Sequence, residues 1–319
     1  MDDAIRCDGL VKRYGDVVAL DHLSLTVPRG SVFGFLGPNG AGKTTAIRLL
    51  TGLARATAGQ ATVAGIKVEA DSVALRERIS YLDQQPHFYD WMRGRELLEF
   101  VGALFGLSGT ALRTRVDEML DLTALTDAAN RKIGGYSGGM RQRLGLAQAL
   151  INEPDVLFLD EPVSALDPSG RHDLLNVIDQ LRGRSTVFMS SHILADIERV
   201  CDRVAIINQG KLVVESTVED LQSRYALPVF VLQFDKADDP GIASLGDQLR
   251  QVPGVTNVTF ERDEMRVSTD DPAGAGSALL REVAQSGVSL LRFERVRPSL
   301  EDIFLRLVSG SSRKSEEQA

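Results

Sequence analysis

Eight consecutive residues near the N-terminal end constrain the fold of this chain more than any other feature. Residues 37–44 read Gly-Pro-Asn-Gly-Ala-Gly-Lys-Thr and match the phosphate-loop pattern G-x-x-x-x-G-K-[ST]. The apolar run 32–36 before them predicts a buried strand, and residues 45–50 after them predict a helix. The pattern requires this strand–loop–helix context, so the sequence predicts an α/β fold of the P-loop type.

The residue types in this loop are those that hold a nucleoside triphosphate. Glycines at 37, 40 and 42 let the backbone turn tightly and aim several N–H groups at one anion. The helix that follows adds the positive end of its dipole. Lys43 is expected to reach the β- and γ-phosphates, and Thr44 offers a hydroxyl to Mg²⁺. The loop residues assigned to nucleotide binding are Gly37, Pro38, Asn39, Gly40, Ala41, Gly42, Lys43, Thr44 and Thr45.

The chain is long enough for two domains, and its texture changes once along its length. Up to about residue 221, strand-like runs alternate with helical patterns, which indicates an α/β domain around a mainly parallel sheet. A leucine-rich helical stretch over about 86–150 interrupts this alternation. Near-continuous apolar runs, typical of strands buried on both faces, lie at 32–36, 156–160, 186–190 and 204–208.

The C-terminal part follows a different pattern, in the order strand, helix, two strands, helix, strand. The expected elements are 229–234, 241–251, 255–261, 264–269, 275–286 and 288–296. This βαββαβ order predicts a small α+β domain of the ferredoxin-like type. We therefore expect a nucleotide-binding domain over 1–222, with a helical subdomain at about 86–150, an accessory domain over 228–309 and a disordered tail over 310–319.

Composition excludes several classes of protein. Against 44 acidic residues there are 36 lysines and arginines, with no dense basic stretch, so we expect no nucleic-acid partner. Two cysteines indicate no disulfide framework and favour a reducing compartment. The N-terminal residues lack the apolar segment of a signal peptide, and no apolar run approaches the roughly 20 residues that span a bilayer. We expect the chain to reach a membrane only through a partner.

Two adjacent acids follow the apolar run 156–159. Asp160 ends a predicted parallel strand, where it can bind Mg²⁺ beside the phosphate loop. Glu161 is then placed to polarise a water molecule against the γ-phosphate. The alternative is a pair of surface acids that cap the next helix.

A second anion receptor is suggested by Ser137-Gly138-Gly139. Ser-Gly-Gly alone is usually a turn or a helix N-cap. A serine, two glycines and a helix N-terminus also converge N–H groups on an anion. A second receptor in one chain is explained if two chains meet head to tail and each offers it to the γ-phosphate bound by the other.

These motifs in this order resemble those of an ABC-type ATPase domain over about 220 residues. The set consists of the phosphate loop, Gln84, 137–139, 159–162, 164–167 and His192. The resemblance implies that ATP is the nucleotide and that Tyr14 stacks on its adenine. It also implies that Gln84 contacts Mg²⁺ and the attacking water, although the adjacent Gln85 leaves this assignment ambiguous.

The resemblance assigns roles to the remaining motifs. It makes Ser137, Gly138 and Gly139, flanked by Met140, a signature motif that acts on the partner's ATP. Asp167 is similar to a loop aspartate that contacts the opposite subunit. His192 is similar to a switch histidine that binds the γ-phosphate, so the implied catalytic group is Glu161, His192 and Gln84. The implied Mg²⁺ ligands are Thr44, Gln84 and Asp160.

The signature reads Tyr-Ser-Gly-Gly-Met, which resembles that of bacterial drug-, antibiotic- and polysaccharide-export ATPases. The resemblance implies an ATP-hydrolysing homodimer that drives separate transmembrane permease subunits from the cytoplasmic face of the membrane. One alternative is a soluble ABC-type ATPase acting on ribosomes or DNA. Another is an ATPase regulated by a small molecule bound to the C-terminal domain. The aromatics Phe88, Tyr89 and Trp91 either line the groove for the permease or belong to the core.

Overall fold

The computed structural model describes residues 3–69, 72–164, 166–225, 229–235, 239–261, 264–296, 299–301, 303–304 and 307. The chain divides into two compact units, one of residues 1–218 with 304–319 and one of residues 219–303. The tail expected over 310–319 lies outside the described residues. Among the described residues, no helix is both long and apolar enough to cross a membrane.

A six-stranded sheet forms the centre of the first unit, in the order β10-β9-β3-β8-β7-β6. Neighbouring strands from β9 to β6 are parallel, and only β10 pairs antiparallel, at one edge. The strands are β3 (Val32–Leu36), β6 (Ile79–Leu82), β7 (Val156–Asp160), β8 (Thr186–Ser191), β9 (Arg203–Asn208) and β10 (Lys211–Thr217). The strands β3, β7, β8 and β9 are largely apolar and almost entirely buried, as expected for strands covered on both faces, so the expected mainly parallel sheet is confirmed.

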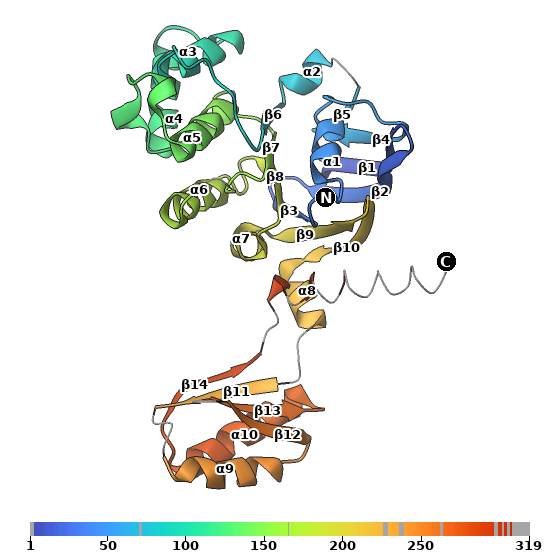
Figure 1. Ribbon diagram of the computed structural model, residues 1–319, viewed down its shortest axis with the longest axis vertical. Coiled ribbons are helices and arrows are strands. Elements are labelled where there is room, and N and C mark those ends of the chain that lie inside the picture. The colour runs from blue at the N-terminus through green and yellow to red at the C-terminus, as the bar shows by residue number, and fades with distance from the viewer. Residues whose placement is uncertain are drawn as a thin grey trace. The chain divides into compact units, whose positions relative to one another are not determined.

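Helices cover both faces of this sheet (Figure 1). One helix, α1, lies between this sheet and a second sheet, whereas α6 and α7 cover the opposite face. The long helices α3, α4 and α5 form the expected helical insert beside the β6 edge. The helices of the first unit are α1 (Lys43–Leu50), α2 (Val73–Arg76), α3 (Gly94–Leu104), α4 (Gly109–Leu122), α5 (Gly138–Leu150), α6 (Pro168–Gln180) and α7 (Leu194–Val200), and α8 (Val218–Arg224) begins at the boundary between the two units.

A separate antiparallel sheet, in the order β2-β1-β4-β5, was not expected from the sequence pattern. Its strands are β1 (Asp3–Tyr14), β2 (Val17–Pro28), β4 (Ala58–Val63) and β5 (Ile66–Lys67). The strands β1 and β2 form a long hairpin, and β4 joins β1 from beyond α1. The first domain therefore has a second sheet in addition to the parallel one.

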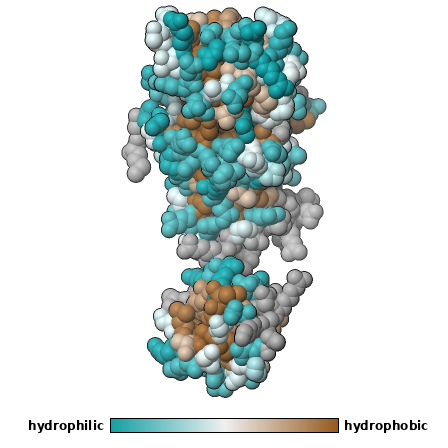
Figure 2. Space-filling model, turned by 90° about the vertical axis from the view of Figure 1, so that its left-hand side faces the viewer, coloured by the Kyte–Doolittle hydropathy of each residue, from teal (hydrophilic) through white to brown (hydrophobic). Residues whose placement is uncertain are grey.

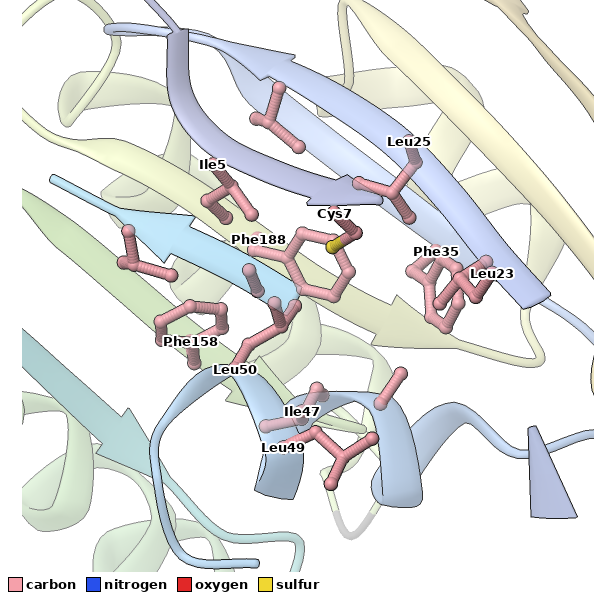
Figure 3. Packing of buried hydrophobic residues seen from close by; sticks show 14 of the residues in the cluster. Ile5, Cys7, Leu23, Leu25, Phe35, Ile47, Leu49, Leu50, Phe158 and Phe188 are labelled. Carbon is pink, nitrogen blue, oxygen red and sulfur yellow. The ribbon is translucent and has the colours of Figure 1, made fainter. Parts of the chain in front are cut away.

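The main core fills the space between the two sheets (Figure 3). Ile5, Leu23 and Leu25 point inward from β1 and β2, and Ile47 and Leu50 point inward from α1. The opposite wall is aromatic: Phe35, Phe158 and Phe188 come from three neighbouring strands, and the ring centroids of Phe35 and Phe188 are 5.2 Å apart. This packing fixes α1, and with it the phosphate loop, against the end of β3.

The second unit has the expected βαββαβ order. Its sheet is antiparallel in the order β12-β13-β11-β14, which places the first strand between the third and the fourth. Leu232, Leu245 and Leu279 pack in a core between this sheet and its two helices. The elements are β11 (Val229–Phe234), α9 (Gly241–Arg250), β12 (Val255–Glu261), β13 (Glu264–Thr269), α10 (Pro272–Ser286) and β14 (Leu290–Arg295).

Both thiols are buried, which predicts slow modification in the native protein. Burial raises the pKa of the Cys7 thiol to about 12 and also raises the pKa of the Cys201 thiol. At pH 8 both groups therefore stay protonated and unreactive while the chain is folded. Ellman's reagent should label neither thiol quickly at pH 8 without denaturant and both in urea. Rapid labelling of the native protein would contradict the burial.

These thiols also determine the direction in which the free energy of unfolding changes with pH. Above the ordinary thiol pKa of about 8.5, the unfolded chain releases protons that the folded chain retains. The contribution of both thiols to the free energy of unfolding is therefore complete below that pH and decreases as the pH rises.

Candidate active site

The phosphate loop connects β3 to α1 in a conformation that depends on two glycines. Gly42 precedes the first residue of α1 with φ of 106°, a region that residues with a side chain rarely adopt. A Cβ atom there would lie 2.5 Å from the Ala19 carbonyl oxygen, and one at Gly37 would lie 2.5 Å from the Ile207 carbonyl oxygen. The loop is therefore held close to β2 and β9 by backbone contacts that only glycine permits.

A cavity of about 340 Å³ opens over this loop. Its wall contains eight of the nine loop residues assigned to nucleotide binding, Gly37 being the exception. Gln84, Glu161 and His192 complete the polar side of the wall. The lining residues are Val17, Val18, Ala19, Pro38, Asn39, Gly40, Ala41, Gly42, Lys43, Thr44, Thr45, Gln84, Glu161 and His192. The fold thus gathers residues from five separate parts of the chain around one phosphate-binding loop.

Three of these side chains contact one another. The Lys43 Nζ atom lies 3.3 Å from Glu161 Oε1 and donates to the Gly37 carbonyl oxygen at 2.8 Å. The Nδ1 atom of His192 lies 2.6 Å from Glu161 Oε2. Because a carboxylate only accepts hydrogen bonds, Nδ1 is the donor in this contact and Nε2 is left for another partner. Lys43 and Glu161 are each 7% exposed, so their opposite charges attract with little screening.

Ser190 on β8 positions the two acids. Its hydroxyl donates to Asp160 Oδ1 at 2.6 Å and accepts from the Glu161 backbone N–H at 3.0 Å. Asp160 and Glu161 are 1% and 7% exposed, which excludes the alternative of surface acids that cap a helix. Glu161 has φ of 49°, an unfavourable value for a residue with a side chain. Such strain at the end of a buried strand is common where a side chain must be aimed at a functional site.

Oxygen donors for a Mg²⁺ ion lie at this end of the sheet. Thr44 and Gln84 line the cavity, and Asp160 ends the neighbouring strand β7. Mg²⁺ prefers one or two carboxylates together with substrate phosphates and water, so this donor set fits the ion. Gln85, the other candidate in the sequence, is not among the cavity-lining residues.

Tyr14, at the end of β1, is half-exposed and lies outside the cavity wall. The ammonium group of Lys12 lies 4.7 Å from the centre of the Tyr14 ring and also donates to the Arg55 carbonyl oxygen at 2.8 Å. The lysine therefore occupies one face of the ring.

The signature residues are placed away from this cavity. Ser137 is exposed and caps α5 by accepting from the Met140 N–H at 3.2 Å, as the simple N-cap interpretation requires. A Cβ atom at Gly138 would meet nothing within 4 Å, so this backbone is open to an approaching group. Asp167 is also exposed and caps α6 through Gly170. Neither segment lines the cavity over the phosphate loop of its own chain.

Sequence reasoning did not identify Ser190 or the lysine beneath Tyr14. The only local signal for Ser190 was its place in Met189-Ser190-Ser191-His192, and both serines are also common turn residues. Its role depends on the pairing of β7 with β8, which aligns Asp160 with Ser190.

Comparison with known proteins agrees with this geometry. A family model described as "ABC transporter" matches residues 20–164, and one described as "ATP-binding protein DrrA1-3-like, C-terminal domain" matches residues 217–308. Among relatives, the "Uncharacterized ABC transporter ATP-binding protein YxlF" of Bacillus subtilis is 38% identical over 94% of this chain and 98% of that protein. The "Daunorubicin resistance ATP-binding protein DrrA3" of Streptomyces coeruleorubidus is 37% identical over 100% and 99%. The "Bacitracin transport ATP-binding protein BcrA" of Bacillus licheniformis is 33% identical over 98% and 99%.

Solved structures lead to the same fold. An ATP-binding subunit of an ABC transporter superposes with a TM-score of 0.64 at 26% identity, over 70% of this chain and 93% of that one. A dimeric structure of a bacterial ABC transporter cassette superposes with a TM-score of 0.62 at 26% identity, over 67% and 98%. The chain therefore belongs to the family of ABC transporter ATP-binding proteins, and it is an ATPase of the ABC type with a DrrA-like C-terminal domain.

Proposed function

We propose that this ATPase powers the export of a drug, an antibiotic or a lipid-like compound through separate transmembrane subunits. The observation that carries the proposal is similarity over the whole chain, C-terminal domain included, to proteins named for daunorubicin resistance and bacitracin transport. Neither a ribosomal nor a DNA-directed function is supported by any of these relatives. The proposed place of action is the cytoplasmic face of the membrane.

The contacts in the cavity support a separate role for each of its polar residues in ATP hydrolysis. Lys43 would bind the β- and γ-phosphates, and Glu161 would accept a proton from the attacking water. His192 would hold the γ-phosphate through Nε2 while Nδ1 keeps its contact with Glu161. Bound Mg²⁺, held through Thr44, Gln84 and Asp160, would neutralise developing charge on the phosphates.

We also propose that the working ATPase is a homodimer. The Ser137-Gly138-Gly139 segment, exposed at its first two residues, lies outside the cavity of its own chain, as expected if it serves the ATP of a second copy. The N-terminal end of α5 would then supply backbone N–H groups to the partner's γ-phosphate. In such a pair each ATP lies between the phosphate loop of one chain and the signature of the other.

The helical insert offers a surface for the transmembrane partner. A cavity of about 710 Å³ lies between the end of α3, α4 and residues 151–153, with Leu104 and Phe105 exposed at its edge. Arg115 stiffens it by donating to the carbonyl oxygens of Leu150 at 2.6 Å and Ile151 at 3.2 Å. Hydrophobic patches also interrupt the polar surface on this side of the molecule (Figure 2). An amphipathic helix from a cytoplasmic loop of the permease is the proposed occupant.

The exposed aromatic residues before α3 flank Asp90, which contacts the helix that follows the signature motif. Tyr89 and Trp91 are 62% and 69% exposed, with ring centroids 5.8 Å apart, so neither belongs to the core. Between them, the Asp90 carboxylate forms an ion pair with Arg141 of α5, and the Asp90 backbone carbonyl oxygen accepts from the Gly134 N–H at 3.0 Å. A partner bound at these aromatics would therefore act directly on the first turn of α5.

Co-expression with a membrane protein from a neighbouring reading frame, one of about six hydrophobic spans, tests the proposal. We expect the ATPase to be retained on membranes and to co-purify with that protein in detergent. Leu104→Asp should abolish retention by placing a charge at the apolar edge that Leu104 and Phe105 form on this cavity, while the ATPase activity of the isolated subunit stays within twofold. Leu53→Asp is the matched control, because Leu53 is 62% exposed and lies outside the insert.

Two results would contradict the proposal. If the wild-type chain never binds the membrane protein but associates with ribosomes or DNA, its function lies elsewhere. If both leucine variants are retained equally well, the permease docks on another surface.

A further inference from the structure

An ion pair joins the two helices that follow Asp167 and His192. The Nε atom of Arg171 lies 2.6 Å from Asp196 Oδ1. Arg171 is in the first turn of α6, which Asp167 caps, and Asp196 is in the first turn of α7, which begins two residues after His192. One contact therefore fixes the spacing between the two turns that support these site residues.

The burial of Asp196 shows how strongly this ion pair constrains the two helices. Asp196 is 3% exposed, and its second carboxylate oxygen is buried and makes no hydrogen bond to any described residue. Arg171 is thus the hydrogen-bonding partner that offsets the cost of burying this charge. A buried carboxylate tolerates little separation from its cation, because the attraction is weakly screened and the desolvation cost is large. Neither turn can shift by an ångström or two without the other.

A second ion pair continues the chain of contacts to the signature helix. Arg143 of α5 lies 3.1 Å from Asp173 of α6, two residues beyond Arg171. The helix α6 is therefore held on one side by the helix that Ser137 caps and on the other by the helix that follows His192. By contrast, Arg199 of α7 reaches Asn176 of α6 further along the same two helices, at an exposed position.

We propose that Arg171 and Asp196 are positioning residues that couple the two ATP sites of the dimer. The proposal rests on the homodimer proposed above, in which Asp167 and the signature face the partner while His192 faces the ATP of its own chain. Closure of the partner against Asp167 would displace the first turn of α6. The ion pair, whose carboxylate is buried, would transfer that displacement to α7 and move His192 relative to the γ-phosphate of its own chain's ATP.

The test compares cooperativity of ATP hydrolysis with nucleotide binding and stability in full-length variants. Wild-type protein is expected to hydrolyse ATP with a Hill coefficient above 1 and at most 2, the number of sites. Arg171→Gln should reduce the Hill coefficient to about 1, while the monomer's affinity for a fluorescent ATP analogue changes less than twofold. Arg199→Gln is the matched control and should keep the wild-type Hill coefficient.

A second variant separates coupling from folding, because Arg171→Gln alone leaves a buried charge unpaired. The double variant Arg171→Met, Asp196→Leu replaces the ion pair by apolar groups, a change that is often neutral or stabilising. It should melt at or above the wild-type temperature and still lose cooperativity. Wild-type cooperativity in this double variant, or an equal loss in Arg199→Gln, would overturn the inference.

A protein that does not dimerise would give a different experimental result from one that dimerises without coupling. A wild-type protein that stays monomeric with ATP and shows a Hill coefficient of 1 would refute both the homodimer and the coupling. A wild-type protein that dimerises cooperatively, with the double variant unchanged, would refute only the coupling.

Discussion

Replacing Glu161 with Gln should reduce the turnover of ATP by about 10²–10⁴-fold, the range typical of a lost general base. Glutamine keeps the size and the hydrogen-bonding oxygen of glutamate, and it is no worse at the observed φ of 49°. It cannot accept a proton from water. ATP binding through the phosphate loop should persist, so the variant should accumulate with ATP as a dimer on gel filtration.

Glu153→Gln is the matched control for this prediction. Glu153 also has a positive φ, of 51°, and is paired with Arg115, but it lies outside the nucleotide cavity. The Glu153→Gln variant should hydrolyse ATP at the wild-type rate and should not accumulate as an ATP-bound dimer. A Glu161→Gln protein with wild-type turnover would show that another group activates the water.

Replacing Lys43 with Ala should weaken ATP binding by about 10- to 150-fold, which corresponds to the 1.5–3 kcal/mol of a hydrogen bond to a charged group. The ammonium is held between Glu161 and the carbonyl oxygens of Gly37 and Pro38, so it is preorganised over the loop. Hydrolysis should become undetectable, because Lys43 is also the cation proposed to neutralise charge on the γ-phosphate. Titration with a fluorescent ATP analogue and a phosphate-release assay measure both effects.

Thermal unfolding separates this loss from misfolding. Lys43→Ala leaves the buried Glu161 carboxylate with His192 as its remaining side-chain partner, so the melting temperature should also fall. Lys211→Ala removes an exposed lysine that pairs with Asp21, and it should change neither binding nor stability measurably. Intact ATP binding by a folded Lys43→Ala protein would mean that the site is misassigned.

Short stretches of sequence were sufficient to predict the elements that are defined by their own residues. The strand β3 coincides with its apolar run and β7 extends one residue beyond its own, to Asp160, because strands buried on both faces are made almost entirely of apolar side chains. The phosphate loop was equally clear, since its glycines and lysine are required within eight residues. The βαββαβ order followed in the same way from short periodic segments separated by turns.

The antiparallel sheet was missed for the opposite reason. The strand β1 pairs with β2 through a nearby turn but also with β4, which lies beyond the phosphate loop and α1. Nothing within β4, whose first three residues are Ala58, Gly59 and Gln60, indicates a partner strand whose paired residues lie 47 to 58 positions away. Pairing over such a distance is decided by which surfaces remain to be covered once the parallel sheet and α1 have packed.

The sequence by itself determined that this chain has a phosphate loop, two acids after a buried strand and a Ser-Gly-Gly segment before a helix. It also determined the order in which they come. Only the tertiary structure decided that Lys43, Glu161 and His192 touch, that Ser190 aligns both acids, and that Arg171 reaches Asp196. Hydrogen bonds and ion pairs of about 3 Å depend on strand order and helix packing, and these bring together residues that are between 25 and 118 positions apart.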